Sequence, residues 1–220
     1  MPMRRFDLSL YLVTDEIRRP GLEDDVIAAV RGGVTLVQLR DKSAPHAVVA
    51  EFARRLKARL DEHRVPLILN DRVEVARMIG AAGVHIGTRD MTPAEARQML
   101  GPNAIIGVSV SEAAHLDRFD PADVDYVGIG PVHTTLTKPD HATPIGAEGL
   151  ARLCAAARLP AVAIGGLTAQ DAPAVRAAGA QGLAVVSAIL SDGDAEQAAR
   201  RLRRAWEEAA SGDVARPAAE

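Results

Sequence analysis

The stretch from Val127 to Gly146, VGIGPVHTTLTKPDHATPIG, begins as an apolar strand and ends as a long polar loop. The loop supplies hydroxyl groups, free backbone N–H groups and one lysine, which are the groups that hold phosphate oxygens. A surface loop without a ligand is the alternative interpretation. A short apolar strand that ends in polar residues recurs along the chain, and this recurrence favours a ligand-binding loop.

Eight apolar runs of this kind follow one another, each leading into an amphipathic segment. Their almost continuous valine, isoleucine, leucine and alanine content is typical of parallel strands buried on both faces. Eight strand–helix units predict a single (β/α)8 TIM barrel over 1–210, with 211–220 frayed. An open doubly wound sheet is the alternative, but no G-x-G-x-x-G motif opens the first helix. We expect strands at 8–14, 35–39, 66–69, 83–86, 104–108, 125–130, 161–164 and 183–186, and helices at 22–31, 47–60, 73–79, 92–100, 111–119, 149–157, 172–178 and 195–209.

Composition narrows the possible partners. The net charge of -3 gives no overall basic field, so we expect binding to neither nucleic acid nor an acidic membrane. No apolar run approaches the roughly 20 residues that span a bilayer, and the short basic start does not resemble a signal peptide. The single cysteine, Cys154, rules out an intrachain disulfide and favours the cytoplasm.

The second predicted strand ends in polar residues at alternating positions. Gln38, Arg40 and Lys42 fall on one side while strand geometry lasts, separated by Leu39 and Asp41. Two cations side by side are costly unless an anion meets them, so this strand end predicts an anion site. A strand that opens into a solvated loop is the alternative.

Carboxylates follow the third and fourth predicted strands. Asp71 comes directly after Asn70, and Asp90 lies shortly after Gly87; each could instead be an ordinary turn residue. At one barrel mouth the two carboxylates would repel each other and an anionic substrate unless a cation lay between them. Mg²⁺ suits such a pair, because it takes one or two carboxylates and completes its shell with water and phosphate oxygens. The positive groups available for the remaining phosphate oxygens are Arg40, Lys42 and Lys138.

A second anion site is expected at the ends of the last two strands. Gly165 and Gly166 follow the seventh strand, and Val186 and Ser187 end the eighth, where barrels of this kind usually hold phosphate with backbone N–H groups. Ser109 adds a hydroxyl at the end of the fifth strand. Of the histidines, we interpret His85 as a core residue with hydrogen-bond partners, and His133 and His141 as solvated loop residues.

Taken together, the strand ends resemble those of the thiamine phosphate synthase family. The resemblance spans nearly the whole chain, and its motifs occur in order and with matching spacing. The motifs are LYLVTD at 10–15, VQLRDK at 37–42, LILND at 67–71, VHIG at 84–87, IGVS at 106–109, YVGIGPV at 126–132, TLTK at 135–138, AIGGL at 163–167 and VVS at 185–187. Thr88, Ser111 and Thr134 depart from the family pattern at the mouth of the site.

The resemblance implies a transferase that joins a pyrimidine diphosphate to a thiazole phosphate and releases pyrophosphate. It implies Mg²⁺ bound by Asp71 and Asp90, and catalytic roles for Arg40, Lys42, Ser109 and Lys138. It implies that the pyrimidine diphosphate contacts the run from Gln38 to Lys42, including Leu39 and Asp41, together with Asn70, Ser109 and Lys138. It implies that the thiazole phosphate contacts Thr135, Leu136, Thr137, Gly166, Val186 and Ser187.

Two other functions remain open at the level of the sequence. A thiazole tautomerase, which shares the fold, would keep the second phosphate site but would not need the carboxylate pair. A non-catalytic phosphate-binding domain would need one anion site but hardly both. Asp71, Asp90, Arg40 and Lys42 occur together in this chain, which favours the synthase.

Overall fold

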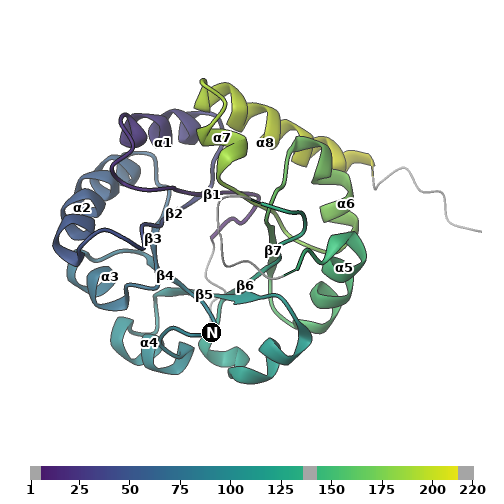
Figure 1. Ribbon diagram of the computed structural model, residues 1–220, viewed down its shortest axis with the longest axis horizontal. Coiled ribbons are helices and arrows are strands. Elements are labelled where there is room, and N and C mark those ends of the chain that lie inside the picture. Colours follow the sequence, from purple (N-terminus) through teal and green to yellow (C-terminus); the bar gives the residue numbers. More distant parts are fainter. Residues whose placement is uncertain (1–5, 136–142, 213–220) are drawn as a thin grey trace, which may run out of the picture.

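A closed barrel of eight parallel strands forms the centre of the computed structural model, which describes residues 6–135 and 143–212. Each strand pairs with its neighbours in sequence, and β1 pairs with β8 to close the ring (Figure 1). The predicted TIM barrel is therefore confirmed. The strands are β1 (Leu10–Val13), β2 (Leu36–Leu39), β3 (Leu67–Asn70), β4 (Gly83–Ile86), β5 (Ile105–Val110), β6 (Tyr126–Ile129), β7 (Ala161–Ile164) and β8 (Leu183–Val185).

Helices surround the strands, and most of them lie within a few residues of the predicted ranges (Figure 1). They are α1 (Leu22–Arg31), α2 (His46–Glu62), α3 (Val73–Ile79), α4 (Pro93–Leu100), α5 (Gly146–Ala156), α6 (Ala172–Ala177), α7 (Ser187–Leu190) and α8 (Ala195–Gly212). None of the helices in the described ranges is long and apolar enough to cross a membrane.

The helix predicted over 111–119 is wrong in type. Two short 3-10 segments, η1 (Ala113–Arg118) and η2 (Pro121–Asp123), occupy this connection. The His115 side chain accepts a hydrogen bond from the Ser111 N–H. The His115 N–H donates to the Glu112 carbonyl three residues earlier, which is the spacing of a 3-10 helix. Pro121 then disfavours a helical conformation at Asp120, so the segment cannot continue as an α-helix.

Alternation along the strands divides the apolar residues into two buried clusters. Leu36 on β2 and Ile68 on β3 point into the barrel together with Tyr11 and Tyr126. Val37 and Leu39 point outward and join the larger cluster between the barrel and the helices. This period of two also directs Gln38 inward, and it brings the last inward side chains to the carboxyl ends of the strands.

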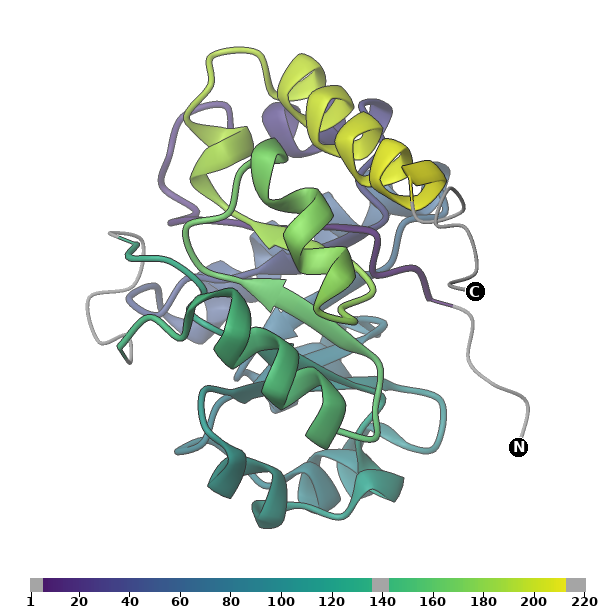
Figure 2. The same ribbon diagram turned by 90° about the vertical axis from the view of Figure 1, so that its right-hand side faces the viewer.

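The first and last helices lie side by side, although they are far apart in sequence. Figure 2 shows α8 beside α1, and Arg31 on α1 binds Glu196 on α8 at 3.0 Å. Trp206 on α8 is buried, and the Arg176 guanidinium lies 3.9 Å from the centre of its ring system. The α8 helix continues to Gly212, beyond the predicted range.

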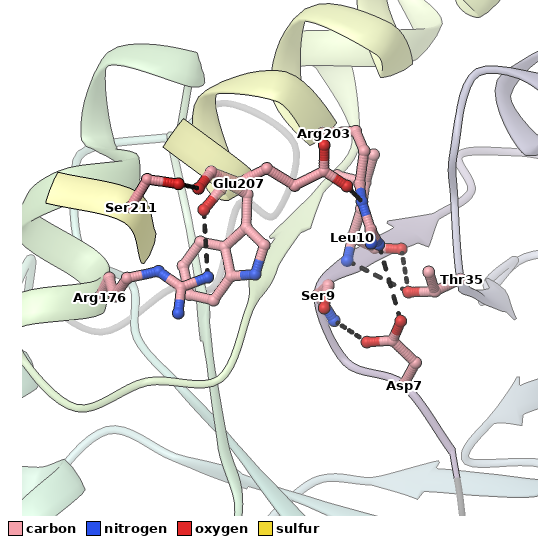
Figure 3. Close-up of polar contacts among 9 residues, drawn as sticks. Asp7, Ser9, Leu10, Thr35, Arg176, Arg203, Glu207 and Ser211 are labelled. Carbon is pink, nitrogen blue, oxygen red and sulfur yellow. Dashed lines mark hydrogen bonds and ion pairs between the residues drawn. The ribbon is translucent and has the colours of Figure 1, made fainter. Parts of the chain in front are cut away.

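The rim at the amino ends of the strands is held by paired polar groups. Thr35 bonds to both the N–H and the carbonyl of Leu10, and Arg203 joins Glu207 at 2.7 Å to Asp7 at 3.6 Å (Figure 3). These contacts connect the start of β1 to α8. The opposite rim, at the carboxyl ends, carries the residues that the sequence marked for function.

Candidate active site

The loop after β2 is built around one carboxylate. Asp41 is buried, and its oxygens accept hydrogen bonds from the N–H groups of Ile17, Ser43 and Ala44 at 2.8–3.0 Å and from the Ser43 hydroxyl. Burial raises the pKa of Asp41, but these hydrogen bonds outweigh it and leave the pKa below its ordinary value. The Asp41 carboxylate is thus occupied inside the loop, and its predicted contact with substrate stays a prediction.

A buried arginine that the sequence did not single out supports the same loop. Arg72 donates to the carbonyl oxygens of Asp41 at 2.7 Å and of Ala44 at 2.8 Å. The Arg40 N–H donates to the Thr14 hydroxyl at 3.0 Å. The backbone that carries Arg40 and Lys42 is therefore anchored on both sides. Leu39 points away from the barrel interior into the outer core.

Asp71 lies at the carboxyl-end rim, close to Asn70 and Lys42. Its Oδ2 accepts from Asn70 Nδ2 at 2.8 Å and lies 3.6 Å from Lys42 Nζ. Its φ of 53° is left-handed, a conformation that Asp tolerates better than most residues. Such backbone strain gathers at functional sites, and here the Asp71 N–H bond to the His85 carbonyl at 2.9 Å supports it.

The two predicted metal ligands are close enough for their charges to interact. Burial and then the negative charge of Asp90 raise the pKa of Asp71, while Lys42 and Arg72 lower it. Asp90 turns back toward its own strand end, where its Oδ2 accepts the Gly87 N–H at 2.7 Å. The donor set fits Mg²⁺, because both ligands are carboxylates and a divalent cation would offset their mutual repulsion. Within 6–135 and 143–212, no group of three or more His, Cys, Asp or Glu able to hold a metal occurs. Mg²⁺ usually keeps several water ligands and binds substrate phosphate oxygens, and these would fill the positions that two carboxylates leave.

Ser109 lies over the barrel interior at the end of β5. Its hydroxyl is 2.9 Å from His85 Nε2, and His85 Nδ1 is 2.9 Å from the Tyr126 hydroxyl. His85 is thus a histidine with partners, as the sequence suggested, but its partners connect it to the predicted site. Tyr11 and Tyr126 were missed, because a tyrosine within an apolar strand looks like an ordinary core residue. The alternation along β1 and β6 places both side chains inside the barrel, but their approach to Gln38 and His85 depends on strand pairing that only the structure shows.

The loops after β6 and β7 are packed directly against each other. A Cβ at Gly166, where φ is 67°, would lie 2.8 Å from both His133 Cβ and the Thr134 carbonyl oxygen. The His133 N–H bonds to the Gly165 carbonyl at 3.0 Å, and His133 Nε2 lies 2.8 Å from Asp171 Oδ1. Glycine at 166 is therefore required by the neighbouring loop itself. His133, expected as a solvated loop residue, is exposed but has Asp171 as a hydrogen-bond partner.

Asp171 holds the turn after β7 and was also missed in the sequence. Its Oδ2 accepts from the Thr168 N–H at 2.7 Å and from the Thr168 hydroxyl at 2.9 Å. Burial raises the pKa of Asp171, but the bonds from Thr168 and His133 outweigh it and lower the pKa. The T-x-x-D spacing of a capping box was the available signal.

The other predicted phosphate ligands divide into described and undescribed residues. Val186 is half-buried between β8 and the short helix α7, which the sequence did not predict, and Ser187 is exposed at the first position of α7. Thr135 is half-buried at the end of the described loop. Leu136, Thr137 and Lys138 lie outside the described residues, as does His141.

A (β/α)8 barrel with cations, a carboxylate pair and glycine turns at the carboxyl ends of its strands belongs to the class of phosphate-handling barrel enzymes. The family model described as thiamine monophosphate synthase matches residues 10–189. The chain therefore belongs to the thiamine monophosphate synthase family and is a transferase, as the resemblance implied.

Individual proteins agree with the family model. A thiamine-phosphate synthase of Azorhizobium caulinodans is 52% identical over 200 residues, covering 90% of this chain and 94% of that protein. One from Psychrobacter is 46% identical, covering 89% and 93%. The solved thiamine phosphate pyrophosphorylase of Pyrococcus furiosus superposes with a TM-score of 0.82 at 34% identity, covering 92% of this chain and 96% of that one. A 3-hexulose-6-phosphate synthase at 19% identity and a TM-score of 0.64 shares the fold.

Proposed function

We propose that this chain condenses a 4-amino-2-methylpyrimidine that carries a diphosphooxymethyl group with thiazole phosphate, giving thiamine monophosphate and pyrophosphate. The observation that carries the proposal is the position of Asp71, which contacts Lys42 and is close enough to Asp90 for the two charges to interact. One rim thereby offers both a cation site and positive side chains to a diphosphate. Membership of the family supplies the identity of the two substrates.

The leaving diphosphate is assigned to the charged half of the rim. Arg40 and Lys42 extend from the anchored loop after β2, Asn70 is the last residue of β3, and Asp71 follows it. Mg²⁺ held by Asp71 and Asp90 would neutralise charge that builds on the departing oxygens. Lys138, Gln38 and Ser109 complete the set of residues assigned to the pyrimidine diphosphate.

The thiazole phosphate is assigned to the other half, formed by the ends of β6, β7 and β8. Gly166 follows β7 and Ser187 begins α7 after β8, so their backbone N–H groups are assigned to this phosphate together with Thr135 and Val186. Leu136 and Thr137 belong to the same assignment. Holding the second substrate by its phosphate orients its ring nitrogen toward the pyrimidine methylene carbon and removes an entropic cost from the reaction.

The reaction proceeds as a dissociative substitution. The electron-rich pyrimidine supports positive charge on its methylene carbon, so the C–O bond to diphosphate breaks ahead of attack. The thiazole nitrogen then donates its electron pair to that carbon. Because this nitrogen carries no proton, the step needs no general base.

Location in the cytoplasm belongs to the same proposal and is supported by the single cysteine.

A three-way assay tests the proposal. Purified chain with both substrates and Mg²⁺ should release one pyrophosphate for each thiamine monophosphate, and omission of Mg²⁺ should abolish turnover. Conversion of thiazole phosphate alone, without condensation, would identify the tautomerase instead. Binding of either phosphate ligand without any conversion would point to a non-catalytic domain.

A further inference from the structure

Five polar side chains from five strands form a continuous hydrogen-bonded chain inside the barrel. Gln38 Nε2 donates to the Tyr11 hydroxyl, which lies 2.9 Å from the Tyr126 hydroxyl. Tyr126 lies 2.9 Å from His85 Nδ1, and His85 Nε2 lies 2.9 Å from Ser109 Oγ. The chain begins and ends at residues assigned to substrate, and its middle lies among the side chains that fill the barrel.

The two tyrosines are buried, and the barrel leaves specific room for one of their rings. Tyr11 is 1% exposed and Tyr126 is fully buried. A Cβ on Gly107 would lie 2.1 Å from Tyr126 Cζ, so only glycine on β5 leaves room for this ring. Burial raises the pKa of both phenols, and therefore both keep their protons. Each hydroxyl must then place one hydrogen on an acceptor, because a buried donor without a partner is costly.

The donor and acceptor roles along the hydrogen-bonded series follow from Gln38, its first residue. A side-chain amide nitrogen only donates, so Tyr11 accepts from Gln38 and places its own hydrogen on Tyr126. Among the residues that the structure describes, the acceptor that remains for Tyr126 is His85 Nδ1, at 2.9 Å. A nitrogen that accepts carries no proton, so the proton of a neutral imidazole lies on Nε2 and points at Ser109 Oγ.

We propose that Tyr11 and Tyr126 are positioning residues that fix His85 in its Nε2-protonated neutral tautomer and thereby make Ser109 a hydrogen-bond donor toward bound substrate. Ser109 Oγ accepts from His85, so its own hydrogen is directed elsewhere. The ligand atom that meets Ser109 is then an acceptor, either a ring nitrogen or a diphosphate oxygen. The role of Ser109 toward substrate rests on the proposed function, whereas the tautomer of His85 does not.

The tautomer can be measured in the free protein by 15N NMR with labelled histidine. His85→Gln assigns the His85 signals among those of the six histidines. In the unmodified protein, His85 Nδ1 should show the 15N chemical shift of an unprotonated nitrogen, and Nε2 should show that of a protonated one. Gln38→Glu replaces a donor by an acceptor. It should reverse the direction of every hydrogen bond in the series and move the proton of His85 to Nδ1. A proton on Nδ1 in the unmodified chain, or no change in Gln38→Glu, would overturn the proposal.

A double-mutant cycle tests the consequence for catalysis. Tyr126→Phe should lower kcat/KM for the pyrimidine diphosphate about tenfold and leave KM for thiazole phosphate unchanged. In the Ser109→Ala background the same change should have little further effect, because the chain acts through Ser109. Equal losses in both backgrounds would overturn the positioning role. Tyr11→Phe, which keeps the ring but interrupts the chain earlier, serves as the second variant if Tyr126→Phe folds poorly. An inactive protein with the expected tautomer would count against the proposed function alone.

Discussion

The two rims of the barrel use the same kinds of charged residue in opposite ways. At the amino-end rim, Arg97 binds the Asp125 carboxylate at 2.7 Å and the carbonyl oxygens of Gly101, Ala104 and Asp123. At the carboxyl-end rim, the Arg40 guanidinium forms no hydrogen bond or ion pair with any residue that the structure describes, while its backbone is anchored. The first arginine satisfies its neighbours, and the second remains available to a ligand.

The carboxylates repeat this contrast. Asp125 accepts from Arg97 and from the Ile106 N–H at 2.8 Å, and it connects α4 to the starts of β5 and β6. Asp71 has a left-handed backbone, and burial and then the nearby Asp90 carboxylate raise its pKa. Unbalanced charge lowers stability, and proteins retain it where binding or catalysis requires it. The rims therefore separate stability from function, and variants on each rim should affect different measurements.

The largest effect is expected for Asp71→Asn. Turnover should fall about 100- to 1,000-fold, because the bound cation loses a carboxylate and the leaving diphosphate loses charge stabilisation. The free energy of unfolding should stay the same or rise, because repulsion with Asp90 disappears. Steady-state kinetics over a range of Mg²⁺ concentrations and denaturant unfolding measure the two quantities. An unchanged rate at limiting Mg²⁺ would remove Asp71 from the metal site.

The opposite pattern is expected for Arg97→Met on the amino-end rim. The side chains of Arg97 and Asp125 are only 15% and 16% exposed, so removal of the cation leaves a mostly buried carboxylate and three carbonyl groups without this donor. The free energy of unfolding should fall by about 3 kcal/mol. Activity per folded molecule should be unchanged at a temperature where the variant is fully folded. Reduced kcat in folded protein would show that the two rims are not separate.

The sequence predicted the carboxyl-end side of this contrast for a physical reason, but it predicted nothing about the amino-end rim. Parallel strands end at one rim, so Asp71 and Asp90 could be placed together from the strand pattern alone. The structural duties of Gly166 and Asp41 could not be predicted, because they depend on how neighbouring loops pack. The chain through Tyr126 and His85 was hidden for a related reason. Period-two alternation tells which side chains point inward, but not which strands across the barrel bring their polar atoms within bonding distance.

Asp41→Asn is expected to sharpen the contrast from within the functional rim. The lowered pKa of Asp41 means that the folded protein favours the charged carboxylate. Its contribution is therefore present above the ordinary aspartate pKa and is lost as pH falls through the lower pKa of the folded state. At pH 7 the variant should be about 1 to 2 kcal/mol less stable, and the difference should shrink in acid. A difference that grows as pH falls would contradict the role of this carboxylate in the loop.

The smallest effect is expected for Asp7→Asn, at the exposed edge of the amino-end rim (Figure 3). The amide keeps an oxygen for the Ser9 N–H, now accepted at 2.8 Å, and removes only the ion pair with Arg203 at 3.6 Å. Asp7 is half-exposed at its side chain and Arg203 keeps Glu207, so water and salt screen the lost attraction. The free energy of unfolding should change by no more than about 0.5 kcal/mol, and the change should vanish in 1 M salt. A loss of unfolding free energy as large as that of Arg97→Met would contradict this expectation. It would mean that an ion pair at this rim stabilises the fold whether or not the pair is buried.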